Sequence, residues 1–300
     1  MPNPRRVAAG ATARLLARLL YKQGPGDLTW LARNLFADRD HRDAAALDAF
    51  AKAYHEIFYL NGSGDMRFNG EMALVQRLSK LPLRTAFDVG ANAGDWTLAI
   101  KQALPAVAVH AFEILPTTAQ ELAARVSHLQ GVRLNRIGLS DVVGDVQVWF
   151  SPGNSVLTSV IEDRTSENPV LAGTWKSQTL PVTTGDAYVS EQCVERIDLL
   201  KIDAEGSEMK VLRGFESSFA RSIIHIVQFE YAPLNKYIPL LLRDLYAFFT
   251  QRGFVVGKLF PNGVAFKPYE AEDENFLGLN YIACRSDRPD FIDCLKYRTV

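Results

Sequence analysis

The chain has 300 residues, of which 48% are hydrophobic and 22% are charged, a composition typical of a soluble globular protein. Its net charge of −1 gives no electrostatic basis for binding nucleic acid or an anionic membrane surface. Cys193, Cys284 and Cys294 lack metal-ligand spacing and are odd in number, which argues against a zinc site or a disulfide framework. No apolar run reaches the ~18 residues of a membrane span. We therefore expect a cytoplasmic protein without a secretion signal.

Residues 1–68 are expected to form a helical extension. Apolar side chains recur at helical spacing within residues 15–20 and again within residues 47–58. A glycine- and proline-containing break at residues 23–27 separates the two segments. The apolar stripes make a homodimer plausible, and they show no chemistry of their own. Residues 69–300 are expected to form the domain that carries the function.

The stretch Thr-Ala-Phe-Asp-Val-Gly-Ala-Asn-Ala-Gly-Asp-Trp at residues 85–96 has the layout of a strand, a tight turn and the start of a helix. Gly90 and Gly94 lack a β-carbon, so a ligand can approach the backbone of this turn closely. Their spacing differs from that of dinucleotide-binding turns, and no phosphate-binding Gly-Lys-Ser/Thr follows. The Asp88 carboxylate would also repel phosphates. The turn therefore suits a ligand with cationic and hydroxyl groups, such as S-adenosylmethionine.

A second acid, Glu113, ends the next apolar stretch, 25 positions after Asp88. In Rossmann-like units an acid near this position accepts hydrogen bonds from the ribose hydroxyls of the ligand. The alternative is that both acids are ordinary residues at strand ends. The combination of two apolar strands, two acids and this spacing favours a ligand site.

Beyond Glu113, helical and strand patterns alternate, which predicts a mostly parallel sheet with helices on both faces. Helices are expected at residues 71–80, 96–104, 117–129 and 238–251, and strands at residues 85–88, 107–113, 132–139, 146–150, 197–203, 223–230, 254–260 and 280–285. Residues 151–180 are expected to form an irregular, substrate-facing insertion, because loops this long inside a compact domain are usually functional or mobile.

Four acids, Asp88, Glu113, Asp203 and Glu230, end predicted strands. The carboxyl ends of parallel strands meet at one edge of a sheet, so these side chains are expected to surround one cleft. Clustered like charges cost stability unless they bind something. The four acids therefore indicate a functional site.

Asp203, Glu205 and Glu230 are the candidate catalytic residues. An alcohol is a poor nucleophile, and a carboxylate within hydrogen-bond reach can take its proton. In a variant of this hypothesis, Asp203 and Glu230 hold Mg²⁺, which would lower the pKa of a coordinated hydroxyl, although no metal motif of fixed spacing supports it. Glu208 lies on the predicted next helix and is expected to be solvated.

Together these motifs resemble the FkbM family of methyltransferases. The resemblance covers about residues 69–285. The matching motifs are Asp-Val-Gly-Ala-Asn-Ala-Gly (88–94), Phe-Glu (112–113), Leu-Lys-Ile-Asp-Ala-Glu-Gly-Ser-Glu (200–208), Leu-Arg-Gly (212–214) and Phe-Glu (229–230). The Lys-Ile-Asp-x-Glu-Gly-x-Glu stretch is the most specific of them. The resemblance implies a Rossmann-like class I methyltransferase fold with a seven-stranded sheet whose last strand is antiparallel. It also implies O-methylation of a sugar or natural-product hydroxyl.

By that similarity, a set of residues is expected to bind S-adenosylmethionine. The methionine part is expected at Asp88, Gly90, Ala91, Asn92 and Gly94, the ribose at Glu113, the adenine edge at Ser140 and Asp141, and a further contact at Asp203.

Glu71 is a separate candidate for the cofactor site. It follows a glycine-rich loop that could close over the site and bring Glu71 to the ammonium group of the cofactor. The alternative is a surface connection with no role.

Two other functions use the same features. A nicotinamide-dependent oxidoreductase would share the sheet and the ribose-binding acid, but it lacks here the second glycine of its turn, and Asp88 opposes its pyrophosphate. A non-catalytic S-adenosylmethionine-binding module would be expected to have lost strand-end acids, and all four are present.

Overall fold

The computed structural model describes residues 42–58, 65–151, 154–159, 175–231, 240–276 and 280–297, together with positions 22, 26, 30, 33, 235 and 238. The chain divides into two units, Met1–Phe58 and Tyr59–Val300. The described helix of the first unit is α3 (Arg42–Phe58), and the helix expected near residues 15–20 lies outside the described residues. Among the described residues, none of the helices has the length and apolar character that crossing a bilayer requires.

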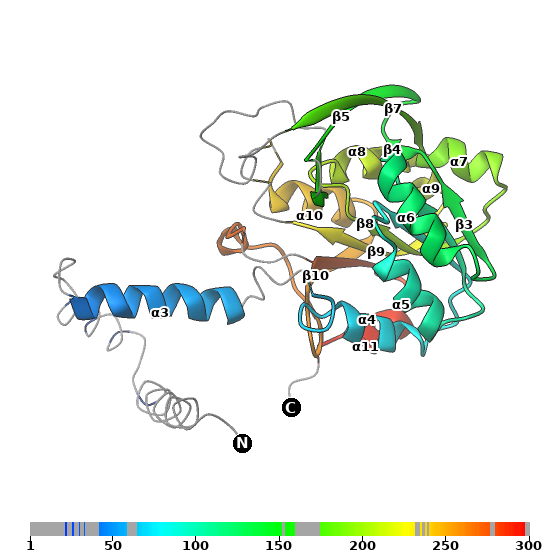
Figure 1. Ribbon diagram of the computed structural model, residues 1–300. Coiled ribbons are helices and arrows are strands. Elements are labelled where there is room, and N and C mark those ends of the chain that lie inside the picture. The colour runs from blue at the N-terminus through cyan, green and yellow to red at the C-terminus, as the bar shows by residue number, and fades with distance from the viewer. Residues whose placement is uncertain are drawn as a thin grey trace, which may run out of the picture. The chain divides into compact units, whose positions relative to one another are not determined.

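The second unit is built around an eight-stranded central sheet (Figure 1). In the order in which they lie side by side, its strands are β11 (Gly263–Phe266), β10 (Phe254–Phe260), β12 (Asn280–Arg285), β9 (Ile224–Glu230), β8 (Ile197–Ile202), β1 (Thr85–Val89), β2 (Ala108–Phe112) and β3 (Val132–Asn135).

Strands β3, β2, β1, β8 and β9 are parallel. The expected antiparallel last strand is confirmed, because β12 runs antiparallel to both β9 and β10. The sheet has one strand more than the seven expected, since a hairpin adds β11 at the edge beyond β10. The strands from β1 to β3 are added toward one edge of the sheet, and the strands from β8 onward are added toward the other edge. The strand order therefore reverses between β1 and β8. In sheets of this kind the ligand cleft lies outside the carboxyl ends of the strands at such a reversal.

Helices cover both faces of the sheet (Figure 1). One face carries α4 (Glu71–Leu78), α5 (Asp95–Ala103), α6 (Pro116–Val126) and α11 (Pro289–Leu295), and the other carries α7 (Gly185–Glu191), α8 (Glu208–Arg213), α9 (Glu216–Ala220) and α10 (Leu242–Thr250). Because side chains alternate along a strand, Leu199 of β8 faces the first group and Leu200 the second. Every residue of β8 is buried, as expected for a central parallel strand.

The strands that lie between β3 and β8 in the chain form a second, four-stranded sheet. Its order is β4 (Gly138–Ser140), β7 (Lys176–Thr184), β5 (Gly144–Ser151) and β6 (Asn154–Ser159). The single strand expected at residues 132–139 is therefore wrong, because β3 and β4 belong to different sheets. The expectation that residues 151–180 form an irregular insertion is also wrong, because β6 and the first part of β7 lie within this range. Residues 160–174 lie outside the described residues. β7 forms by pairing with β5 across a long sequence separation, which local propensity does not reveal.

Candidate active site

The turn between β1 and α5 is held tightly by its neighbours. Gly90, Asn92 and Gly94 all have positive φ, at 75°, 47° and 90°. A β-carbon on Gly90 would lie 1.9 Å from the backbone oxygen of Asp203, and one on Gly94 would lie 2.5 Å from Cδ1 of Leu122. Packing against backbone therefore requires glycine at position 90, whereas at position 94 the clash is with the end of a leucine side chain and the positive φ is what favours glycine. At Gly90 the space that a side chain would fill is taken by the end of β8.

Asp88 lies beneath this turn and has no exposed surface. Thr97 Oγ1 donates a hydrogen bond to Asp88 Oδ2 at 2.7 Å, and the Lys201 Nζ lies 3.5 Å from Oδ1. Burial raises the pKa of Asp88, and the Lys201 charge opposes that rise. The contact of Asp88 with the methionine part of the cofactor stays a prediction.

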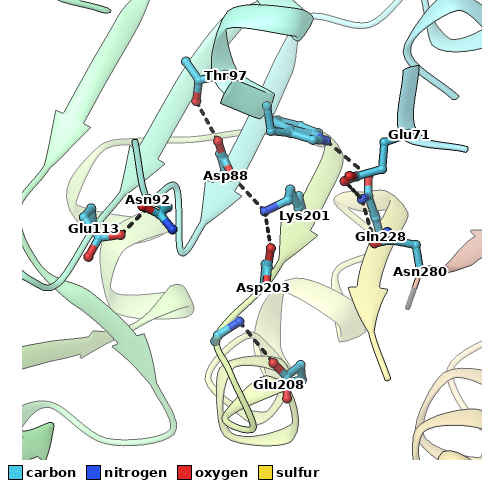
Figure 2. A network of polar contacts seen from close by, with 12 residues as sticks. Glu71, Asp88, Asn92, Thr97, Glu113, Lys201, Asp203, Glu208, Gln228 and Asn280 are labelled. Atoms are coloured by element: carbon cyan, nitrogen blue, oxygen red, sulfur yellow. Dashed lines mark hydrogen bonds and ion pairs between the residues drawn. The ribbon is translucent and has the colours of Figure 1, made fainter. Parts of the chain in front are cut away.

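Glu113 stands beside the same turn. Its Oε2 accepts a hydrogen bond from the backbone amide of Asn92, and its Oε1 accepts one from Leu115, both at 2.9 Å. Burial raises the pKa of the Glu113 carboxyl, while these two amides lower it. Each carboxylate oxygen keeps a further acceptor position. Oδ1 of Asn92, next to Glu113, is buried and has no hydrogen-bond partner (Figure 2).

Glu71 belongs to a buried polar network that the sequence did not reveal. Gln228, a fully buried residue of β9, donates from Nε2 to Oε1 of Glu71 at 2.7 Å and to Oδ1 of Asn280 at 3.1 Å. Trp96 Nε1 donates to Oε1 of Gln228 at 3.2 Å. Figure 2 shows this network to one side of Lys201. The sequence signal was Gln228 within a largely apolar strand.

Three carboxylates from two neighbouring strand ends gather beyond the turn. Asp203 follows β8, Glu205 lies in the next turn, and Glu230 ends β9. One oxygen from each of the three lies within 4.8 Å of the other two. Burial and the charges of nearby acids, Asp203 first among them, raise the pKa of both Glu205 and Glu230. Glu205 also has a φ of 46°, a strained backbone that often marks functional sites.

Lys201 places a cation inside this acidic region, a role that the sequence motifs did not predict. Its Nζ donates to Oδ2 of Asp203 at 3.1 Å (Figure 2), and 5% of the residue is exposed. Burial lowers its pKa, but the charges of Asp203, Asp88 and Glu71 outweigh burial and raise it. Lys201 is therefore charged at any working pH. The spacing could have revealed it, because residues two apart on a strand share a face.

Glu208 is not solvated, contrary to the expectation. It is 2% exposed, and its Oε1 accepts hydrogen bonds from the backbone amides of Ala204 and Gly206, each at 3.1 Å. It thereby closes the turn after β8. Burial raises the pKa of Glu208 to about 7, although the amides oppose the rise.

Ser140 and Asp141 lie at the end of β4, in the second sheet. Ser140 is buried, and its hydroxyl donates to Oδ1 of Asp141 at 3.2 Å, while Asp141 is exposed. The carbonyl of Ser140 packs against Gly214, where a β-carbon would lie 2.1 Å away. The contact of Ser140 and Asp141 with the adenine stays a prediction.

The residues around the turn suit S-adenosylmethionine. Asn92 offers a buried amide oxygen without a partner, Glu113 offers acceptors for hydroxyl groups, and the acids beyond β8 and β9 suit a cation. The turn carries no cationic side chain for a phosphate. The strand order and this site together define the class I S-adenosylmethionine-dependent methyltransferases.

Comparison with known proteins identifies the family. Residues 88–256 match the model of the methyltransferase FkbM domain, and the chain belongs to this family. It is 28% identical to methyltransferase sdnD of Sordaria araneosa over 183 residues, which cover 52% of this chain and 71% of that protein. It is 29% identical to the 31-O-demethyl-FK506 methyltransferase FkbM of Streptomyces tacrolimicus over 159 residues, covering 46% and 61%.

Two further proteins match this chain over very different shares of their own length. The antimetabolite synthetase AmbE of Pseudomonas aeruginosa is 27% identical over 248 residues, which cover 73% of this chain and 11% of that protein. The plantazolicin methyltransferase BpumL, solved with S-adenosylhomocysteine, aligns over 85% of this chain and 94% of its own, at 9% identity and a TM-score of 0.38. The match to the FkbM family identifies the chain as a methyltransferase. It argues against the alternative function of a nicotinamide-dependent oxidoreductase.

Proposed function

We propose that this protein is a cytoplasmic O-methyltransferase that methylates a hydroxyl of a sugar or another small natural product. The observation that carries the proposal is the trio Asp203, Glu205 and Glu230, gathered at the carboxyl ends of β8 and β9. Methylation of an alcohol requires removal of its proton, and a carboxylate with a raised pKa is a stronger base when ionised.

When bound, S-adenosylmethionine supplies a methyl group on a positively charged sulfur. The acceptor oxygen forms a bond to the methyl carbon while the carbon–sulfur bond breaks, and its electron pair stays on sulfur. In this proposal Asp203, held by Lys201, orients the hydroxyl. Glu205 or Glu230 takes the hydroxyl proton, so the products are the methyl ether, neutral S-adenosylhomocysteine and a protonated carboxyl group. Positioning of the two reactants contributes much of the rate enhancement.

For the cofactor we propose that Glu113 binds the ribose and that residues 90–94 lie against the methionine part. Glu71 is proposed to lie near the ammonium group, and Ser140 and Asp141 near the adenine. The two unpaired acceptor positions on Glu113 and the unpartnered Oδ1 of Asn92 support this arrangement.

The direct test is methyl transfer from radiolabelled S-adenosylmethionine to a panel of hydroxyl-bearing sugars and natural products, with matched panels of amines and thiols. We expect label in an acid- and base-stable ether. Label only in amines or thiols would overturn the proposal of O-methylation and leave the methyltransferase class intact.

Mg²⁺ at the carboxylate trio is a second candidate, supported by the distances of up to 4.8 Å among its oxygens and by the preference of Mg²⁺ for oxygen ligands. One oxygen of Asp203 is already engaged by Lys201, which weighs against it. Turnover lost in chelator and restored by Mg²⁺ would establish the metal, whereas full turnover in chelator would remove it.

We also propose a homodimer formed through α3. Leu47, Phe50 and Tyr54 are exposed at helical spacing on this helix. Light scattering of the wild type and of Phe50→Ser tests the proposal, and a monomeric wild type at micromolar concentration would overturn it.

A further inference from the structure

Lys201 joins two segments that are far apart in the sequence. Its ammonium donates to Asp203, which follows β8, and it forms an ion pair with Asp88 of β1, just before the proposed cofactor-binding turn. The two nitrogen–oxygen distances are 3.1 Å and 3.5 Å. Among the described residues, these are the ion pairs that Lys201 forms.

The backbone repeats this connection. The amide of Asp203 donates to the carbonyl of Val89 at 3.0 Å, and the carbonyl of Asp203 occupies the space where Gly90 would carry a β-carbon. The turn after β1 and the turn after β8 are therefore in direct contact, and Lys201 pairs with Asp88 at the end of β1 and with Asp203 in the turn after β8.

We propose that Lys201 is a positioning residue, which holds the Asp203 carboxylate and the cofactor-binding turn together as one rigid unit. The role rests on the proposed function of Asp203, because Lys201 acts through Asp203 and the turn and touches no reactant itself. A lysine suits this task because its ammonium has three donors on one small charge. Without the ammonium group, the carboxylates of Asp88 and Asp203 repel each other, and no group holds them at a fixed separation.

The experiment is a double-mutant cycle on the affinity for S-adenosylhomocysteine, measured by calorimetry with the full chain. The variants are Lys201→Met, Asp203→Asn and the double variant. We expect Lys201→Met and Asp203→Asn each to weaken binding by at least about tenfold, and the double variant to bind within about twofold of Lys201→Met, because both changes break one unit.

Two controls separate positioning from a general loss of stability. Lys101 is a buried lysine on α5 whose hydrogen bonds within the described part of the chain go to the backbone carbonyls of Pro105 and Val107. We expect Lys101→Met to lower the melting temperature and leave the affinity within about twofold of the wild type. Lys201→Arg keeps the cation and is expected to recover most of the lost affinity.

If Lys201→Met does not fold, the variant Asp88→Asn/Lys201→Met replaces the buried ion pair with neutral groups of similar size, a change that such sites tolerate. It is expected to fold and still to bind weakly. Wild-type affinity in either variant that carries Lys201→Met would overturn the role of Lys201. A cycle in which the affinity losses of the two single variants multiply in the double variant would overturn it as well. A well-folded wild type that does not bind S-adenosylhomocysteine would instead overturn the proposed function.

Discussion

Gly90 and Asp203 are in backbone contact: a β-carbon on Gly90 would lie 1.9 Å from the carbonyl oxygen of Asp203. The first residue belongs to the turn after β1 and the second to the turn after β8, the two strands between which the sheet order reverses. The contact brings the proposed cofactor and acceptor regions to one place.

Gly90→Ala is expected to destabilise the protein more than an ordinary glycine substitution, on the order of 2–4 kcal/mol, since a positive φ and a backbone clash coincide. Urea denaturation measures the effect. Gly253→Ala is the matched control, because Gly253 has a similar φ of 77° and its β-carbon would meet nothing nearer than 3.9 Å. We expect that control to cost about 1 kcal/mol. Equal losses in the two variants would contradict the role of the contact.

Glu113→Ala is expected to weaken S-adenosylhomocysteine binding by at least about tenfold, because it removes the acceptors for the ribose and unpairs the amide of Asn92 in the turn. Calorimetry checks the prediction. Glu121→Ala, an exposed acid on α6, should bind like the wild type. An unchanged affinity in Glu113→Ala would place the ribose elsewhere.

Glu230→Gln and Glu205→Gln test the proposed base. The residue that takes the proton is expected to lose about 10²–10⁴-fold in kcat when replaced, with S-adenosylhomocysteine affinity nearly unchanged. Because burial and neighbouring acids raise the pKa of both groups, the base ionises later than a free glutamate, and wild-type kcat/KM should rise with pH through that raised pKa. The exposed Glu191→Gln on α7 is the control. Full turnover in both variants would remove these residues as bases.

Stability should depend on pH through Glu208. Its pKa rises from 4.5 in the unfolded chain to about 7 in the fold, so the folded state holds the proton more tightly. Its stabilising contribution is present below pH 4.5 and is lost as the pH rises through about 7, a difference of roughly 3 kcal/mol.

Glu208→Gln keeps an acceptor for the amides of Ala204 and Gly206, and it is expected to flatten this dependence. The measurement is the free energy of unfolding in urea at pH 5 and pH 8, with Glu121→Gln as the control. An unchanged slope in Glu208→Gln would assign the pH dependence to another group.

The sequence by itself determined most strands of the central sheet, the glycine turn and the acids at the strand ends. Strand period, turn chemistry and an acid after an apolar run are local patterns, so β10 and β12 appear at the predicted residues 254–260 and 280–285. The same patterns placed Asp203 and Glu230 on strands that prove to be neighbours in the sheet.

Only the tertiary structure decided which of these acids are covered and what they touch. The burial of Asp88 and Glu208, the ion pair between Lys201 and Asp88, and the link between Gln228 and Glu71 all depend on the packing of segments far apart in the chain. The hydrogen bonds that satisfy a buried polar group, and the charges that shift its pKa, come from such neighbours. A local pattern can name a carboxylate, but its surroundings decide whether it binds, supports or reacts.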